Sequence, residues 1–230
     1  MMPEFGCRVF RYLVGLLLMH QYIVETGNTV RGLLEMVGRE ISLIKEQTSK
    51  LREVIIKFKT QGLDFNSADL NEDFSDAYVM SAYFRLANST SGADELKSEI
   101  VKTQALIGTH QLTIQTLCGL ILQIAKQGIT LVHGSFLARD SYTIGTPPGR
   151  IIAPLTLRDI IWQACNQTIY CKEGNYPQPV IDLFTELEIS HGSQFSLSRY
   201  PRQSRAKQII RLLEWLNYKT YISDMRLLLP

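Results

Sequence analysis

Apolar residues recur at helical spacing along two long stretches of the chain. In residues 30–58 and 96–124 they advance by alternating steps of four and three, which is a heptad pattern sustained over about four heptads. Each stretch predicts an amphipathic helix of about 30 residues, roughly 45 Å long. The first pattern comprises Val30, Leu34, Val37, Ile41, Ile44, Thr48, Leu51, Ile55 and Phe58. The second comprises Leu96, Ile100, Thr103, Ile107, His110, Ile114, Leu117, Ile121 and Ile124.

Shorter helices are predicted around these two. They cover residues 9–24, 69–86, 156–170, 180–189 and 204–218. Thr156 and Asp159 are spaced as a capping box for the third of them. The second long helix is expected to end near Gly128, and a strand over 129–136 is the alternative for the residues that follow. Residues 139–154 are predicted to form a loop. Alternation with period two is too brief to predict a sheet, so the fold class is all-α.

Composition is that of a protein able to bury a core: 230 residues, 45% hydrophobic and 20% charged. One compact domain is expected, made of an N-terminal apolar helix (1–27), a long helical hairpin (28–150) and a C-terminal helical part (151–230). The apolar run at 12–19 is too short to span a bilayer and has no cleavage site after it. It indicates a core-docking helix in a cytoplasmic protein without a membrane partner.

The sequence has few of the signatures that indicate disulfides, metal sites or catalytic residues. The four cysteines are too few for a disulfide scaffold, and the spacing of Cys165 and Cys171 does not fit a structural zinc site. The four histidines are scattered, and His110 falls in a heptad pattern, where a hydrogen-bonded core or interface histidine is expected. No metal and no cofactor are therefore predicted.

Charge is uneven although the net charge is only +2. From residue 196 onward, seven basic residues stand against Glu214 and Asp224. Such a segment attracts phosphate, although a solvated helix face has the same composition. The candidates for RNA contact in it are Arg199, Arg202, Arg205 and Lys207.

One segment carries a specific likeness. Residues 157–174, LRDIIWQACNQTIYCKEG, resemble the active-site helix of HEPN proteins (higher eukaryote and prokaryote nucleotide-binding), and most closely HEPN-like toxins. In those relatives this helix carries an Arg-Asn-x3-His motif. The stretch 123–134 and Gly149-Arg150 also resemble the family, so the likeness covers about residues 120–215. It implies a helical bundle, a homodimer, metal-independent RNA cleavage and a cognate antitoxin.

The motif is degenerate in this chain. Cys165 stands at the Arg position and Tyr170 at the His position, whereas Asn166 is kept. A phenol with a pKa near 10 is a poor base at neutral pH, and a neutral thiol supplies no positive charge. The two positions also lie about 140° apart around a straight helix, so they converge only where the helix ends or bends, or across a dimer. We therefore expect a catalytically inactive relative that retains RNA or nucleotide binding through Gln163, Asn166 and the basic segment.

Two alternatives stay open. The protein is an active HEPN ribonuclease that uses His133 as base with Arg139 or Arg150 as cation, or it is a helical oligomerisation module without RNA affinity.

Overall fold

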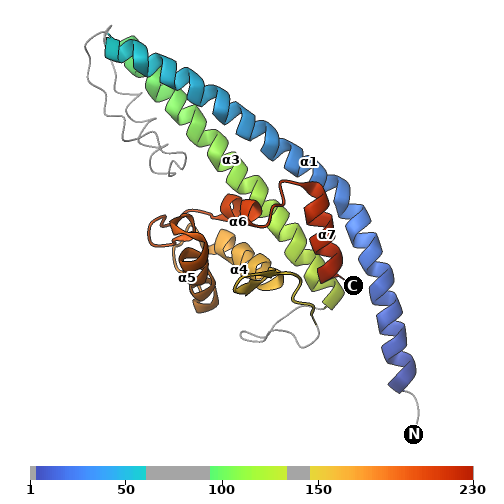
Figure 1. Ribbon diagram of the computed structural model, residues 1–230. Coiled ribbons are helices and arrows are strands. Elements are labelled where there is room, and N and C mark those ends of the chain that lie inside the picture. Colours follow the sequence, from blue (N-terminus) through green and yellow to red (C-terminus); the bar gives the residue numbers. More distant parts are fainter. Residues whose placement is uncertain (1–3, 61–93, 134–145, 230) are drawn as a thin grey trace. The chain divides into compact units, whose positions relative to one another are not determined.

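The computed structural model describes residues 4–60, 94–133 and 146–229, and this part of the chain is mainly α-helical (Figure 1). The all-α prediction is thus confirmed. The elements are α1 (Glu4–Thr60), α3 (Asp94–His133), β1 (Ile151–Ile152), β2 (Leu155–Thr156), α4 (Leu157–Tyr170), α5 (Gln178–His191), the 3-10 turn η2 (Ser193–Phe195), α6 (Ala206–Leu212) and α7 (Tyr218–Leu228).

The chain forms two compact units. The larger unit comprises Met1–Glu35 and Leu117–Pro230, and the smaller unit comprises Met36–Thr116. Both long helices contribute to each unit. The division expected after residue 27 therefore falls inside α1, which continues through it without a break. The reason is that residues on both sides of position 27 keep helical spacing, and Gly27 itself is accommodated in the helix.

The smaller unit is an antiparallel pair of long helices. Its core consists of Leu51, Val54, Ile55, Ile100 and Ile107. These positions include four members of the two heptad patterns, so the two patterns pack against each other within the chain here. The expected interface histidine is also found, because His110 Nδ1 donates to Glu40 Oε2 across the two helices at 2.6 Å. The predicted helix at 69–86 lies outside the described residues.

The larger unit places the other helices against the second half of α3. Its largest fully buried apolar side chains come from α3, α4, α5 and the α6–α7 turn, and include Ile121, Leu157, Phe184 and Trp215. α7 runs beside α3 in Figure 1, and His133 Nε2 donates to the Leu228 carbonyl at 2.8 Å. α4, which carries the predicted site positions 165, 166 and 170, buries one side in the interior of this unit.

α3 is longer than predicted. It passes through Gly128 and ends at His133, so neither the helix end at Gly128 nor the alternative strand is correct. Gly128 serves packing instead. A Cβ at this position would lie 2.6 Å from Tyr22 Cε1, and the Tyr22 hydroxyl donates to the Ile124 carbonyl at 2.6 Å. The glycine permits this close approach of α1 to α3.

The helix predicted over 204–218 is in fact two. α6 ends at Leu212, and Glu214 adopts a left-handed backbone with φ +57°. Asn217 then caps α7, since its side chain accepts a hydrogen bond from the Lys219 amide. The turn buries Trp215, which a continuous helix would place elsewhere. The structure also differs from an all-helical prediction in a short antiparallel hairpin, in which the two-residue strands β1 and β2 pair.

Among the described residues, one helical stretch, Glu95–His133, is long and apolar enough to cross a membrane. More than half of its most apolar window is buried within the protein (56%), as in the core helix of a globular fold.

Candidate functional site

The helix that carries the motif begins as predicted. Thr156 is the N-cap of α4, where its hydroxyl accepts from the Asp159 amide at 3.3 Å and donates to Asp159 Oδ2 at 2.6 Å. The acidic side chain in the first turn also suits the helix dipole. α4 ends at Tyr170, and the Gly174 amide donates back to the Tyr170 carbonyl at 3.1 Å. Gly174 has φ +71°, so a residue without Cβ is suited to this turn.

Cys165 is a buried thiol. It is 1% exposed, and its Sγ donates to Gln123 Oε1 on α3 at 3.2 Å. Burial raises the pKa of the Cys165 thiol, an effect that nearby Lys126 partly opposes. The thiol is therefore neutral near pH 7. It offers no charge and little access to a substrate.

Asn166 and Gln163 are joined to a lysine of the other helix. Lys126 Nζ donates to Asn166 Oδ1 at 2.7 Å, and Asn166 Nδ2 donates to Gln163 Oε1 at 3.1 Å. The Lys126 ammonium also lies 4.5 Å from the centre of the Trp162 ring, a cation–π contact. We call these four residues, Lys126, Trp162, Gln163 and Asn166, the lysine cluster.

Two members of this cluster, Trp162 and Lys126, were not predicted as site residues, and its one charged group is that of Lys126. Partial burial lowers its pKa, because desolvation disfavours the ammonium. A signal was present, since Lys126 lies within 123–134, the stretch that resembles the HEPN family. Its partner Asn166 is 40 residues away in the chain, and no local pattern connects the two.

Three of the predicted positions share a face of α4. Gln163, Asn166 and Tyr170 are spaced by three and four residues, which stacks them along one side of a helix. Gln163 and Asn166 are half-buried, and Tyr170 is 37% exposed. Cys165 lies off this face and is covered. The accessible side of α4 therefore presents two carboxamides and a phenol, whereas the Cys165 thiol is not exposed on it.

The basic segment is only partly accessible. Arg199 and Arg202 are exposed, whereas Arg205 and Lys207 are buried. Arg205 is 1% exposed, lies 4.2 Å from the centre of the Tyr200 ring, and donates to Gln203 Oε1 at 2.7 Å. Arg205 and Lys207 thus belong to the packed structure, and burial excludes them from a surface that contacts RNA in this conformation.

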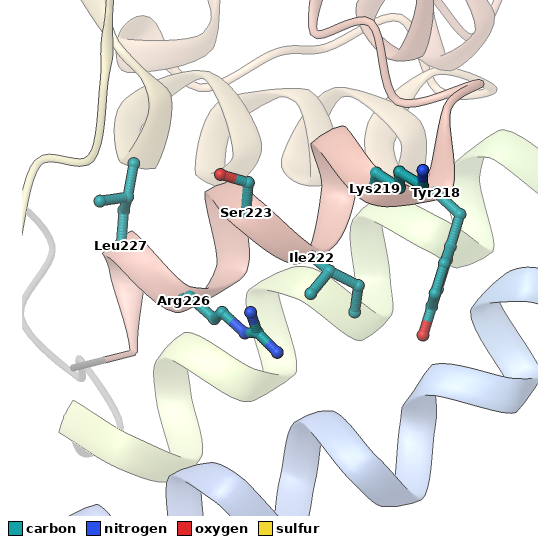
Figure 2. Close-up of a pocket in the computed structure, with 6 residues that line it drawn as sticks. All are labelled: Tyr218, Lys219, Ile222, Ser223, Arg226 and Leu227. Atoms are coloured by element: carbon teal, nitrogen blue, oxygen red, sulfur yellow. The ribbon is translucent and has the colours of Figure 1, made fainter.

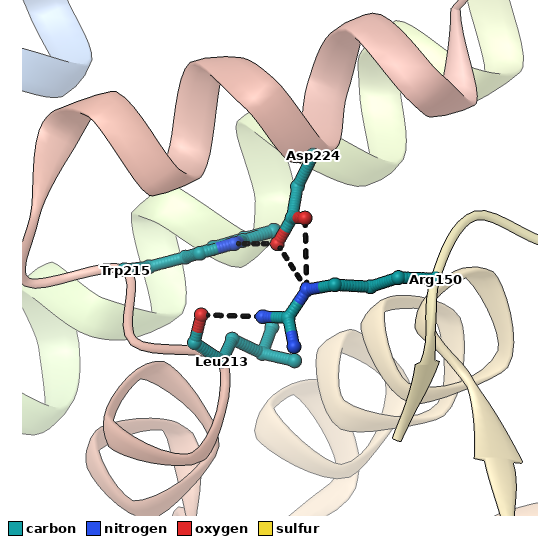
Figure 3. A network of polar contacts seen from close by, with 4 residues as sticks. All are labelled: Arg150, Leu213, Trp215 and Asp224. Atoms are coloured by element: carbon teal, nitrogen blue, oxygen red, sulfur yellow. Dashed lines mark hydrogen bonds and ion pairs between the residues drawn. The ribbon is translucent and has the colours of Figure 1, made fainter.

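The alternative catalytic residues have structural partners. Figure 3 shows Arg150 held by Asp224, through Nε at 2.9 and 3.1 Å, and by the Leu213 carbonyl, through Nη2 at 2.7 Å. Trp215 Nε1 donates to the same carboxylate at 2.7 Å. His133 Nε2 is bonded to the Leu228 carbonyl. Arg139 lies outside the described residues.

A shallow pocket of about 400 Å³ lies along α7, and none of the predicted site residues lines it (Figure 2). Its lining combines two cations with hydroxyl and apolar groups: Tyr218, Lys219, Ile222, Ser223, Arg226 and Leu227. In the described part of the chain, no group of three or more His, Cys, Asp or Glu side chains is arranged to hold a metal ion.

Comparisons with known proteins add no relative. No family model matches the chain, and no curated protein or solved structure matches it either.

Proposed function

We propose that this protein is a HEPN-like helical protein that has lost RNA cleavage and binds RNA or nucleotide phosphate. The supporting observation is the chemistry at the motif positions. The Cys165 thiol is buried and bonded to Gln123, while Asn166 is paired with Lys126. The site therefore has a cation but lacks the imidazole and guanidinium that cleavage in the family implies.

Cleavage of a ribose phosphodiester needs a base for the 2′-hydroxyl proton. A general base contributes about 10²–10⁴-fold to rate, and an electrostatic stabiliser contributes about 10²–10³-fold. The two candidate substitutes, His133 and Arg150, already bond to the Leu228 carbonyl and to Asp224. Retained activity through them would require both to leave their partners.

Binding has better support than catalysis. Lys126 is a partly buried ammonium on a tryptophan face, next to two amides that donate and accept hydrogen bonds. A phosphate that replaced Asn166 as its partner would gain a charge-assisted hydrogen bond in a site of reduced dielectric. The amides would contribute further donors.

Two assays test this proposal. The first incubates RNA with the wild-type protein, with Cys165→Arg/Tyr170→His and with Tyr170→His alone, each checked for native circular dichroism. We expect no cleavage by wild type, since its motif lacks both groups. Cleavage by wild-type protein that survives His133→Ala contradicts the proposal, and cleavage lost in His133→Ala favours the active-ribonuclease alternative.

The second assay measures RNA affinity. Lys126→Ala should weaken binding about tenfold, the effect of one lost charge-assisted contact. Lys50→Ala removes an exposed lysine paired with Glu46 on α1 and is the matched control. Equal affinities for wild type and both variants would remove the lysine cluster from the proposal.

The association partners remain proposals as well. We propose a homodimer, and a cognate antitoxin as the partner that the HEPN resemblance implies. In the smaller unit, Met36, Leu43, Leu106 and Leu112 are exposed, and they would favour association between chains if they form one contiguous patch. Light scattering should give twice the chain mass. A dimer that shows no RNA affinity at low salt would identify the protein as an oligomerisation module instead.

A further inference from the structure

A stretch without acidic residues follows α5. Between Gly192 and Leu213 the chain has five basic residues and no Asp or Glu. Three of the five, Arg199, Arg202 and Arg211, are exposed, and the first two precede α6. No ion pair to Arg199 or Arg202 is found in the described residues. Residues 196–205, which we call the arginine loop, thus present two solvent-exposed guanidinium groups.

The arginine loop is fastened to α4. Gln167 is fully buried, its Nε2 donates to the Gln203 carbonyl at 2.7 Å, and its Oε1 accepts from the Arg205 amide at 3.0 Å. The buried Arg205 side chain also packs against the Tyr200 ring of the loop in a cation–π contact. These buried contacts hold the loop in place. Arg199 and Arg202 are exposed on it, and Arg199 Nη1 donates to the exposed Ser193 hydroxyl at 3.2 Å.

The loop also lies next to the end of the motif helix. A Cβ on Gly174 would lie 3.4 Å from Arg202 Cγ and 3.7 Å from Arg202 Nε. The Gly174 amide in turn bonds to the carbonyl of Tyr170. Arg202 therefore packs on the turn that immediately follows the exposed phenol ring.

We propose that Arg199 and Arg202 bind consecutive phosphates of single-stranded RNA, with an adjoining base stacked on Tyr170; this rests on the proposed function. Arginine is always charged and pairs with phosphate through two donors. A base is free to stack on an aromatic ring only where it is unpaired, which selects a single strand over a duplex. The RNA strand then continues along α4 from Tyr170 towards Asn166 and Gln163. Tyr170 and Gln163 are about 10 Å apart along the helix axis.

A salt-dependent titration with a fluorescent single-stranded RNA tests the proposal. Arg199→Gln/Arg202→Gln should weaken binding at least tenfold and reduce the slope of log K against log salt by about 1.4, as expected for two lost phosphate contacts on a single strand. Lys219→Gln/Arg226→Gln removes the same number of exposed charges from the α7 pocket and is the matched control. Tyr170→Ala should weaken binding about tenfold, whereas Tyr170→Phe should preserve it.

The outcomes separate the two proposals. Wild-type protein that binds no RNA even at low salt defeats the proposed function itself. RNA binding lost in the α7 control but kept in Arg199→Gln/Arg202→Gln overturns this inference and assigns RNA to the α7 pocket. Equal affinity for a duplex of the same length, or for polyglutamate, overturns it too, because the surface would then bind any polyanion. Unchanged thermal unfolding midpoints show that the exposed substitutions leave the fold intact.

Discussion

Asp224 shows how a single residue organises the C-terminal part of the larger unit. Its carboxylate is 2% exposed and accepts hydrogen bonds from Arg150 and Trp215 (Figure 3). Removing the Asp224 carboxylate leaves the Arg150 Nε–H and the Trp215 indole N–H without their acceptor, although Arg150 Nη2 keeps the Leu213 carbonyl. Because buried groups without partners are costly, Asp224 stabilises the junction of the hairpin, the α6–α7 turn and α7.

We therefore predict that Asp224→Ala lowers the free energy of unfolding by about 3 kcal/mol, towards the lower end for breaking a buried pair, since Arg150 is partly exposed. Urea unfolding followed by circular dichroism measures the change. Asp224→Asn should lose less, because an amide oxygen still accepts from Trp215. The exposed substitution Glu46→Gln should leave the midpoint unchanged. A loss in Asp224→Ala no larger than that control would show that the network does not stabilise the fold.

Individual residues also mark the limit of sequence reasoning about the site. Positions 165, 166 and 170 were predicted from the resemblance of one segment to the HEPN helix, and all three lie on the single helix α4. Lys126 was not, because its contact with Asn166 joins two helices. Arg205 was assigned to the surface by its type, but it is buried through contacts with Tyr200 and Gln203 that no local composition encodes.

At the scale of elements, two glycines in long helices have opposite effects. Gly128 on α3 faces Tyr22, and an added methyl group there meets the ring at 2.6 Å. Gly32 on α1 has no atom within 4 Å of an added Cβ. A glycine inside a helix otherwise costs about 0.5–1 kcal/mol relative to alanine.

Gly32→Ala is accordingly predicted to stabilise the protein by about 0.5–1 kcal/mol. Gly128→Ala should destabilise it by about 1–3 kcal/mol, because the Tyr22 ring must move and its hydrogen bond to Ile124 is strained. Chemical denaturation of both variants gives the signs directly. In Tyr22→Ala, the same Gly128→Ala change should cost much less. Equal effects of the two glycine substitutions would contradict the close approach of α1 and α3.

Elements with a strong local signal were predicted well. The Thr156 cap and the end of α4 at Tyr170 were both expected, as was a helix around 180–189, which α5 extends at each end. The prediction of one helix over 204–218 was wrong, because the apolar spacing continues through the turn between α6 and α7. That turn buries Trp215, and Asn217 then caps α7 as a new helix. Tertiary burial decided that boundary, and periodicity alone does not reveal it.

At the scale of the whole molecule, buried acids should govern the response to alkaline pH. Desolvation raises the pKa of Cys118 from 9.0 to about 12, and that of Tyr22 from 10.0 to about 12. The folded state therefore keeps these protons after the unfolded state has lost them. Stability is present below the unfolded pKa and declines as pH rises above about 9. The lowered pKa of Lys126 acts in the opposite sense.

We predict that the free energy of unfolding falls between pH 8 and pH 10.5, with roughly 2 kcal/mol of the fall at pH 10.5 due to Cys118. Urea titrations at these two values measure it. Cys118→Ala lowers stability at both, through the lost side chain, but should show a shallower decline. An identical decline in this variant and in wild type would mean that Cys118 does not titrate as its burial requires.

The whole-molecule organisation was predictable only in part. The heptad patterns predicted two helices that each bury an apolar stripe, but they did not indicate whether the stripes pack within one chain or between chains. In the smaller unit the two patterns pack against each other within the chain. They did not indicate that α1 and α3 extend beyond those stretches, or that the compact units divide at residues 35 and 116. The division depends on which helices pack beside α3, and these lie far along the chain.

The fully buried carboxamide of Gln167 has a consequence for how this protein tolerates variation. Its Nε2 donates a hydrogen bond to the Gln203 carbonyl, and its Oε1 accepts one from the Arg205 amide, both in the arginine loop. Glutamate of equal size has no hydrogen to give at neutral pH, and methionine has neither capacity, so neither is interchangeable with it. In homologues of this protein, position 167 should therefore vary less than Arg199 and Arg202, the exposed arginines of the loop that Gln167 anchors. A substitution at position 167 should be accompanied by a different loop conformation.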